Sequence, residues 1–358
     1  MSRKLASVRR INDIQPIPNA DAIQVATIDG WKVVVKKDAF KVGDLAIYFE
    51  IDSWIPTEIA PFLTKEGKQP SVFNEVKGER LRTVKLRGQL SQGLLVPLNV
   101  GMNAFVGSKF DEGQELMEFF APGQDLTELL VIQKWDMPIP AQLAGQARGN
   151  FPSRVPKTDQ ERVQNIYSDV VAANEIGLQF EITEKLEGSS CTFFLDTEGE
   201  FHVCSRNLDL QRDESNSFWR AAVKYDVEAK MREHNQIGVA IQGELIGPGI
   251  QDNIYKLNDI EFHVFDVYDV RKGDYLVPAE RQELTQKLGL LHVPVLSQAA
   301  SLYDTLGITD IPGILSFAEG KSKLLSSQER EGIVFKEVNG GMTFKAISNK
   351  YLLDYLVN

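Results

Sequence analysis

Residues 181–190 read Glu181-Ile182-Thr183-Glu184-Lys185-Leu186-Glu187-Gly188-Ser189-Ser190. Apolar and polar side chains alternate toward the lysine, as they do in a β-strand. A carboxylate stands two positions after the lysine, and a glycine follows it. The rest of the chain is interpreted around this stretch, because a lysine in this setting is a candidate nucleophile.

A lysine nucleophile would attack the α-phosphate of a nucleotide and hold AMP as a phosphoramidate. The amine can do this only when it is neutral, whereas an ordinary lysine has a pKa of about 10.4. A second cation or a bound metal ion would lower that pKa, and an unneutralised carboxylate would raise it. The motif alone is weak, since Lys-x-Asp/Glu-Gly occurs by chance in about one chain of this length in five. The alternative is a solvated strand lysine before a turn glycine.

Length, cysteine content and net charge limit the class of protein to which this chain can belong. A length of 358 residues favours two domains. The two cysteines, Cys191 and Cys204, imply no disulfide framework and favour a reducing compartment, so we expect a cytoplasmic protein. We find no signal peptide and no segment of membrane-spanning length. The net charge of −11 argues against a general nucleic-acid coat protein but leaves room for a local basic groove.

The first 120 residues are predicted to be rich in β-strands. Asp29-Gly30 indicates a hairpin, and residues 44–51 and 93–98 are strand candidates. Residues 81–88 alternate apolar and basic side chains, which predicts a strand with one buried and one cationic face. Short strands between glycine turns favour a small barrel of the OB type. Residues 121–150 are interpreted as a linker or irregular extension, which gives expected domains 1–150 and 151–358.

The second domain is predicted to be built mainly of antiparallel strands with flanking helices, so the overall fold class is α+β. Thr158 and Glu161 form a capping-box pattern that predicts a helix to about Ala173. Further helices are expected over 217–234 and 278–288. Strands are expected over 180–195 and 201–205, as a hairpin, and over 238–246, 260–270, 332–338 and 342–347.

Five residues beyond Lys185 have the chemical kinds that an AMP-accepting lysine needs: carboxylates for a divalent cation, cations for the phosphate and an aromatic ring for the base. They are Arg206, Glu244, Phe265, Glu331 and Lys345. Each alone has a stronger ordinary interpretation, such as a core phenylalanine or a solvated glutamate. Their joint occurrence in this order is much harder to attribute to chance.

This set resembles motifs I, Ia, III, IIIa, IV and V of the covalent nucleotidyltransferases, which include polynucleotide ligases and mRNA capping enzymes. Within that superfamily the chain is most similar to ATP-dependent RNA ligases with an N-terminal OB domain. The closer likeness rests on residues 85–88 with 91–93, on 156–159 with 161–165, and on 344–352. The resemblance extends over essentially the whole chain.

The resemblance implies a role for each residue. Lys185 would carry AMP, with Lys345 and Glu331 as the other catalytic residues. Glu187, Glu244 and Glu331 would hold Mg²⁺ or Mn²⁺ through its waters. The ATP-binding residues would be Glu184, Lys185, Glu187, Arg206, Glu244, Phe265, Glu331 and Lys345, with Phe265 stacking on adenine.

The implied reaction seals 3′-hydroxyl and 5′-phosphate RNA ends through lysyl-AMP and RNA-adenylate. We expect RNA ends as partners, in a nicked duplex, with no membrane and no obligatory protein partner. Two features depart from the superfamily pattern. Glu187 stands where aspartate is usual, and only thirteen residues follow Lys345, so no C-terminal OB domain is expected. The alternatives are a DNA ligase and a non-catalytic OB-fold nucleic-acid-binding protein.

Overall fold

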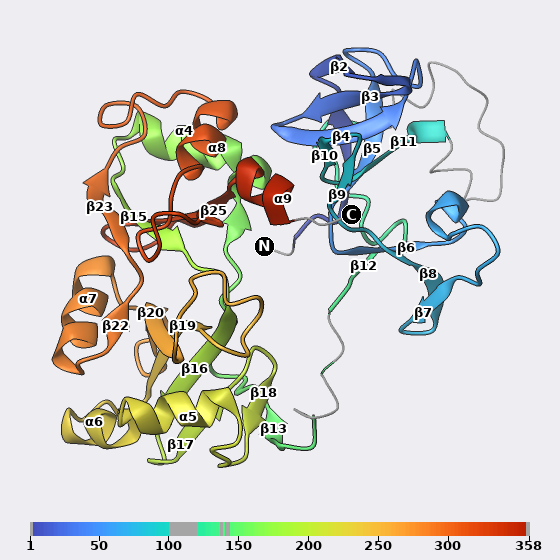
Figure 1. Ribbon diagram of the computed structural model, residues 1–358. Coiled ribbons are helices and arrows are strands. Elements are labelled where there is room, and N and C mark those ends of the chain that lie inside the picture. Colours follow the sequence, from blue (N-terminus) through green and yellow to red (C-terminus); the bar gives the residue numbers. More distant parts are fainter. Residues whose placement is uncertain (1–2, 100–119, 137–138, 140–143, 356–358) are drawn as a thin grey trace. The chain divides into compact units, whose positions relative to one another are not determined.

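Figure 1 shows the computed structural model, which describes residues 3–99, 120–136, 139 and 144–355. Its contacts divide the chain into two compact units. The N-terminal unit comprises Met1–Met137 with Leu352–Asn358, and the C-terminal unit comprises Pro138–Tyr351. The predicted linker over 121–150 and boundary near 150 stay predictions. Within its described residues, the chain has no helix long and apolar enough to cross a membrane.

The N-terminal unit is built from small antiparallel sheets. Their strand orders are β1-β5-β11, β2-β3-β4, β12-β6-β8-β7 and β10-β9. The strands are β1 (Ala6–Arg10), β2 (Asp13–Ile17), β3 (Ala20–Ile28), β4 (Trp31–Lys36), β5 (Leu45–Phe49), β6 (Ser53–Pro56), β7 (Ser71–Phe73), β8 (Val76–Arg80), β9 (Val84–Leu86), β10 (Gln89–Ser91), β11 (Leu94–Pro97) and β12 (Gln133–Lys134), with a 3₁₀ helix η1 at Pro61–Leu63. Two apolar clusters fill the unit, one around Ile47 and Phe49 and one around Trp31 and Tyr48.

The sequence predicted one of two hairpin turns in this unit and missed the other. Asp29 and Gly30 both have positive φ, 46° and 84°, and join β3 to β4 as predicted. The predicted single strand over 81–88 is wrong. Arg87 and Gly88 also have positive φ, 51° and 80°, so the chain reverses there and β9 pairs with β10. The apolar side chains of this segment do not form one buried face either, because Leu81 is buried whereas Val84 is 41% exposed and Leu86 is 43% exposed.

The C-terminal unit has two sheets. The larger follows the order β13-β18-β17-β16-β19-β20-β21, with β22 pairing in parallel to β20, and the smaller follows β14-β25-β24-β15-β23. The strands are β13 (Ala147–Asn150), β14 (Glu161–Arg162), β15 (Phe180–Lys185), β16 (Ser189–Leu195), β17 (Phe201–Cys204), β18 (Leu208–Leu210), β19 (Val239–Ile246), β20 (Glu261–Asp269), β21 (Asp274–Tyr275), β22 (Leu291–His292), β23 (Val295–Ala300), β24 (Gly332–Glu337) and β25 (Thr343–Ile347). The helices are η2 (Val163–Asn165), α4 (Tyr167–Glu175), α5 (Ser217–Lys224), α6 (Val227–Glu233), α7 (Pro278–Lys287), α8 (Ile311–Ala318) and α9 (Asn349–Tyr355). This mixture confirms the predicted α+β class.

Three predicted elements of this unit need correction. The expected strand 180–195 is two strands, β15 and β16, which belong to different sheets. The expected helix from residue 158 begins only at Tyr167, after β14 and η2. The expected helix 217–234 is broken into α5 and α6 at Asp226, whose φ is 49°. The expected strands 238–246, 260–270, 332–338 and 342–347 and the helix near 278–288 are present within one or two residues.

The turn between β15 and β16 carries the chain from one sheet to the other. A Cβ on Gly188 would lie 2.4 Å from the carbonyl oxygen of Leu245 and 2.7 Å from an Ile246 methyl group. Only glycine allows β19 to approach this closely. The glycine of the lysine motif therefore serves a packing purpose, since it lets the turn after β15 lie against the end of β19, a central strand of the larger sheet.

Candidate functional site

Lys185 is the last residue of β15, at the point where the chain leaves the smaller sheet. It pairs in register with Gly332 of β24, so Glu331 stands next to it at the start of the neighbouring strand. Lys185 Nζ donates a hydrogen bond of 2.6 Å to Glu331 Oε2, and the two side chains are 27% and 18% exposed. The candidate nucleophile is thus tied to a carboxylate and remains partly accessible.

Glu244 and Lys345 approach the same place from two further strands. Glu244 on β19 pairs with Ser190 of β16, directly beyond the turn that follows Lys185. Lys345 on β25 pairs with Val334 of β24, which itself neighbours β15. Glu187 lies in the turn, and its N–H donates to the Tyr255 hydroxyl at 2.8 Å. We call Lys185, Glu187, Glu244, Glu331, Lys345 and Arg162 the charged cluster.

Burial and the neighbouring carboxylates have opposite effects on the pKa of Lys185. Removal from water lowers this pKa, but the negative charges of Glu331 and Glu244 outweigh that effect, and the pKa is raised above its ordinary value. Lys345 was expected to lower this pKa and the carboxylates to raise it until a metal ion offsets them, and in the protein without ligands the carboxylates prevail. The carboxylates raise the pKa of the nucleophile as expected, so Lys185 is protonated in this state.

Lys345, Glu244 and Glu187 have shifted pKa values too. Burial together with the neighbouring charges of Lys185 and Arg162 lowers the pKa of Lys345 to about 7. Burial raises the pKa of Glu244 to about 8, and burial with the charge of Glu331 raises that of Glu187. Shifts of this size in a half-buried cluster are typical of functional sites.

The residue types fit a divalent cation held through water. Glu187 has a buried Oε2 with no hydrogen-bond partner. The raised pKa values of Glu187 and Glu244 mean that a nearby cation would favour their ionised forms. No three His, Cys, Asp or Glu side chains stand close enough to ligate a metal directly in the parts of the chain that are described. An ion bound by outer-sphere contacts is compatible with both observations.

Glu184 directly precedes Lys185 on β15. Its side chain is buried, and its Oε2 accepts the N–H of Lys323 at 2.7 Å. Its Oε1 is buried without a partner, and burial raises the pKa of this carboxyl group. A buried acceptor with an unused oxygen fits a ligand that donates a hydrogen bond.

Arg206 and Phe265 lie on the larger sheet. Arg206 follows β17, is about half exposed, and donates to both carboxylate oxygens of Asp159 at 2.9 Å. Its charge acts on the pKa of Glu244. Phe265 lies on β20, where its carbonyl oxygen accepts from Lys336 Nζ at 2.5 Å. All the residues predicted for the site lie in the C-terminal unit.

Sequence reasoning left two residues outside the site. Arg162 on β14 pairs with Lys345 of β25 and influences the pKa of both site lysines. Tyr351 hydrogen-bonds to Glu187, and burial raises its pKa. The sequence made Arg162 a candidate cation for the leaving pyrophosphate, but the capping-box pattern placed it inside a helix, whereas it lies on an edge strand. Its position in the 161–165 segment was the available signal.

Comparisons with known proteins agree with this arrangement. The model of an OB-fold domain matches residues 5–98, and the model of the RNA ligase family matches residues 178–351. A mutant of the Naegleria gruberi RNA ligase with AMP and Mn is 39% identical, with a TM-score of 0.80 and 99% of each chain covered. The same ligase with PPi is 40% identical, with a TM-score of 0.79 and 99% of each chain covered. A further mutant with ATP and Mn is 40% identical, with a TM-score of 0.79, covering 98% of this chain and 99% of that one.

A search of curated proteins found no match. The OB-fold match confirms the barrel type predicted for the first domain. The RNA ligase match and the full-length likeness to the Naegleria structures confirm the resemblance on which the site was predicted.

Proposed function

Because this chain belongs to the RNA ligase family, we propose that it uses ATP and Mg²⁺ or Mn²⁺ to seal a 3′-hydroxyl to a 5′-phosphate RNA end. Lys185 takes AMP from ATP with loss of pyrophosphate. AMP then passes to the RNA 5′-phosphate, and the 3′-hydroxyl displaces it. The observation that carries this proposal is the Lys185–Glu331 pair set between Glu244 and Lys345 where the two sheets meet.

In the first step, Lys185 Nζ must lose its proton before it attacks. Glu331 accepts a hydrogen bond from this amine and stabilises its charged form, so the resting enzyme is unreactive. A divalent cation at Glu187, Glu244 and Glu331 would offset those carboxylates and take up charge on the phosphates. Lys345, with a pKa near 7, and Arg162 are placed to contact the α-phosphate oxygens.

The nucleoside would be bound by residues on both sheets. Phe265 offers an aromatic face for adenine, a contact worth about 1–3 kcal/mol for stacked bases. The unpartnered Oε1 of Glu184 is an acceptor for the adenine amino group. Glu244 and Arg206 are assigned to the ribose and the adjoining phosphate.

The N-terminal unit is assigned the RNA substrate, which we take to be a nicked duplex, and the alignment of the pyrophosphate leaving group. Support comes from the OB-fold match and from the basic residues between Lys77 and Arg87. We keep domains 1–150 and 151–358 as part of this proposal, together with a cytoplasmic location, which two buried free cysteines support. A fragment beginning near Asn150 is expected to lose Lys185 adenylation but to keep some sealing of pre-adenylated nicks. If a folded fragment shows normal adenylation, the N-terminal unit does not align the pyrophosphate and its role is limited to RNA binding.

The experiment that tests the proposal is incubation with ATP labelled in the α-phosphate. A ligase forms an acid-labile covalent AMP adduct that chases into sealed RNA when nicked duplexes are added. A non-catalytic OB-fold protein would trap no label. A DNA ligase would seal all-DNA nicks as fast as nicks with RNA at the junction, and either result would overturn the proposal.

A further inference from the structure

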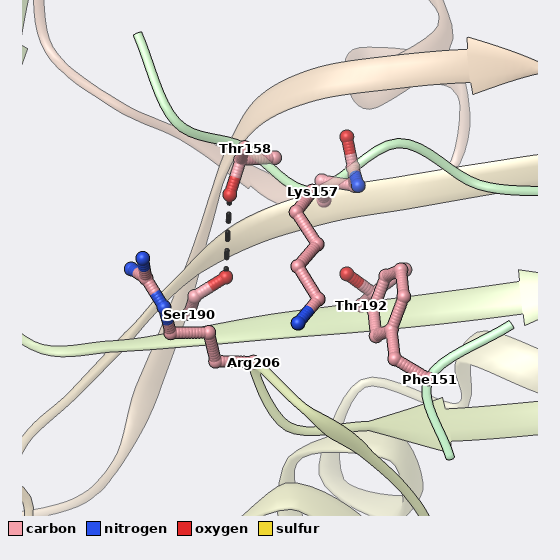
Figure 2. A pocket seen from close by; sticks show the side chains of 7 residues that line it. Phe151, Lys157, Thr158, Ser190, Thr192 and Arg206 are labelled. Carbon is pink, nitrogen blue, oxygen red and sulfur yellow. Dashed lines mark hydrogen bonds between the residues drawn. The ribbon is translucent and has the colours of Figure 1, made fainter. Parts of the chain in front are cut away.

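A polar pocket opens on the inner face of the larger sheet of the C-terminal unit, beside the charged cluster. It is open to solvent, and the empty space of about 230 Å³ along its lining includes part of that solvent. Figure 2 shows its labelled side chains converging on this space, with the Thr158 and Ser190 hydroxyls 3.5 Å apart along one side. The lining residues are Phe151, Lys157, Thr158, Ser190, Thr192, Arg206 and Gln242.

The position of the pocket follows from strand register. Ser190 pairs with Glu244, and Thr192 pairs with Gln242, so the floor of the pocket lies one step further along β16 and β19 than the charged cluster. Residues 151–158 cover it, since Pro156 accepts a hydrogen bond from Gln242 Nε2 at 2.9 Å. The pocket therefore continues the nucleotide site without including Lys185, Glu331 or Lys345.

Gln242 leaves an acceptor unused in this pocket. Its side chain is fully buried, and its Nε2 is identified by the carbonyl group that it faces. Its Oε1 is buried and has no hydrogen-bond partner. A buried amide oxygen without a partner has lost its hydrogen bonds to water, and a ligand hydroxyl group can restore one by donating to it.

Lys157 supplies a positive charge to the same space. Its Nζ donates to the neutral Oδ1 of Asn207 at 2.7 Å. Within the described residues, no carboxylate forms an ion pair with it, whereas Arg206 is paired with Asp159. Hydroxyl groups, an unused acceptor and an unneutralised cation together suit a ribose with its phosphate.

We propose that this pocket binds the ribose and phosphate of an RNA nucleotide next to the ends being joined. Gln242 Oε1 accepts a hydrogen bond from the ribose 2′-hydroxyl, and Lys157 contacts the phosphate. The AMP ribose has the same hydroxyl chemistry, but the single phosphate of AMP must stay on Lys185. The β- and γ-phosphates of ATP share this chemistry with an RNA phosphate, and the adenylation assay below distinguishes the two. This inference rests on the proposed function, whose own failure would appear as absence of lysyl-AMP in the unaltered enzyme.

The test separates the ATP-dependent step from sealing in the full-length protein. Lys157→Met, Gln242→Leu and Thr192→Val are assayed for lysyl-AMP formation and for sealing of a pre-adenylated nick. Each nick carries ribose or 2′-deoxyribose at the terminal nucleotide on the 3′-hydroxyl or the 5′-phosphate side. Lys272→Met, which alters an exposed lysine in the turn before β21, is the matched control.

We expect all variants to form lysyl-AMP within about twofold of the parent. Lys157→Met should raise KM for the nick about tenfold and reduce the slope of log affinity against log salt by about one. Gln242→Leu should seal ribose and deoxyribose nicks at one rate, where the parent prefers ribose about tenfold at one of the two positions. If Gln242→Leu misfolds, Thr192→Val provides the same readout from the other side of the floor.

Three outcomes would overturn the assignment. Loss of adenylation together with a raised KM for ATP would show that the pocket binds the ribose of ATP. Unchanged discrimination between ribose and deoxyribose in both floor variants would remove the 2′-hydroxyl contact. An equal rise in KM for Lys272→Met would show that Lys157 acts only through the general charge of the protein.

Discussion

The C-terminal unit contains two groups of opposite charges that differ in how fully they are paired. The first, which we call the buried network, links Glu181, Asp266, Arg281 and Lys336, all with side chains no more than 8% exposed. Lys336 contacts Asp266, and Arg281 contacts Glu181 directly. The second is the charged cluster, where Lys185 and Glu331 are 27% and 18% exposed.

The charged cluster leaves members without a direct partner. In the described part of the chain, the side chains of Glu244 and Lys345 make no hydrogen bond or ion pair, and their pKa values move to about 8 and about 7. In the buried network each charged side chain lies against an opposite charge, although burial still lowers the pKa of Lys336 to about 8. Unmatched charges that remain accessible indicate a site completed by what binds there.

The largest effect is expected from the nucleophile. Lys185→Ala should abolish lysyl-AMP formation, because no other group can form the phosphoramidate. Sealing of a nick supplied with a pre-adenylated 5′ end should persist, since that step needs no lysyl-AMP. Covalent labelling with ATP, followed by the pre-adenylated assay, measures both. Labelling of Lys185→Ala at the parental rate would remove this residue from the mechanism.

Breaking the buried network should damage the fold. Lys336→Met leaves Asp266 buried without its partner and removes the hydrogen bond to the Phe265 carbonyl. Loss of one member of a buried ion pair costs about 3–5 kcal/mol. Chemical denaturation should therefore show a large fall in the free energy of unfolding.

The double variant Lys336→Met/Asp266→Leu is the control for that experiment. It should recover part of the loss, because no uncompensated charge remains. A single variant as stable as the parent would mean that Lys336 and Asp266 are not paired in solution.

Removing carboxylates from the charged cluster should affect activity more than folding. Glu244→Ala and Glu331→Ala should each slow adenylation about 10²–10³-fold, the usual cost of losing one group that stabilises transition-state charge. Titration with Mg²⁺ should show weaker metal dependence in both. Glu198→Ala, at a site 63% exposed, is the matched control. If the adenylation rate of either variant depends on magnesium as that of the parent does, the role assigned to that carboxylate is wrong.

The contrast between the charged cluster and the buried network also separates the residues that the sequence could predict from those that it could not. Lys185, Glu244, Glu331 and Lys345 were predictable, because chemistry requires certain residue types and the family preserves their order along the chain. The separation of β15 from β16 was not, because it depends on how closely β19 approaches Gly188. Glu181 and Lys336 look like ordinary polar strand residues, and only tertiary packing shows that both are buried.

A smaller effect is expected at a histidine away from both groups. His202 Nδ1 lies 2.8 Å from Asp209, and its Nε2 lies 3.2 Å from Asp196. The hydrogen bond to Asp209, reinforced by Asp196 and opposed by burial and by Arg148, raises the pKa of His202 above its ordinary 6.5. A folded-state pKa above the unfolded value stabilises the protein below the unfolded pKa, and this contribution is lost as pH rises through the folded pKa.

The melting temperature should therefore respond to His202→Gln in a pH-dependent way. At pH 6 the substitution removes a charged histidine held between two carboxylates, so the melting temperature should fall by a few degrees, as about 1 kcal/mol produces in a domain of this size. As the pH rises through the folded-state pKa the parent loses that stabilisation, so the two proteins should melt closer together at alkaline pH. His234→Gln is the control, because His234 forms no ion pair with any described residue. An equal drop at both pH values would mean that His202 acts through packing against Phe194, whose ring centroid lies 5.6 Å away, and not through charge.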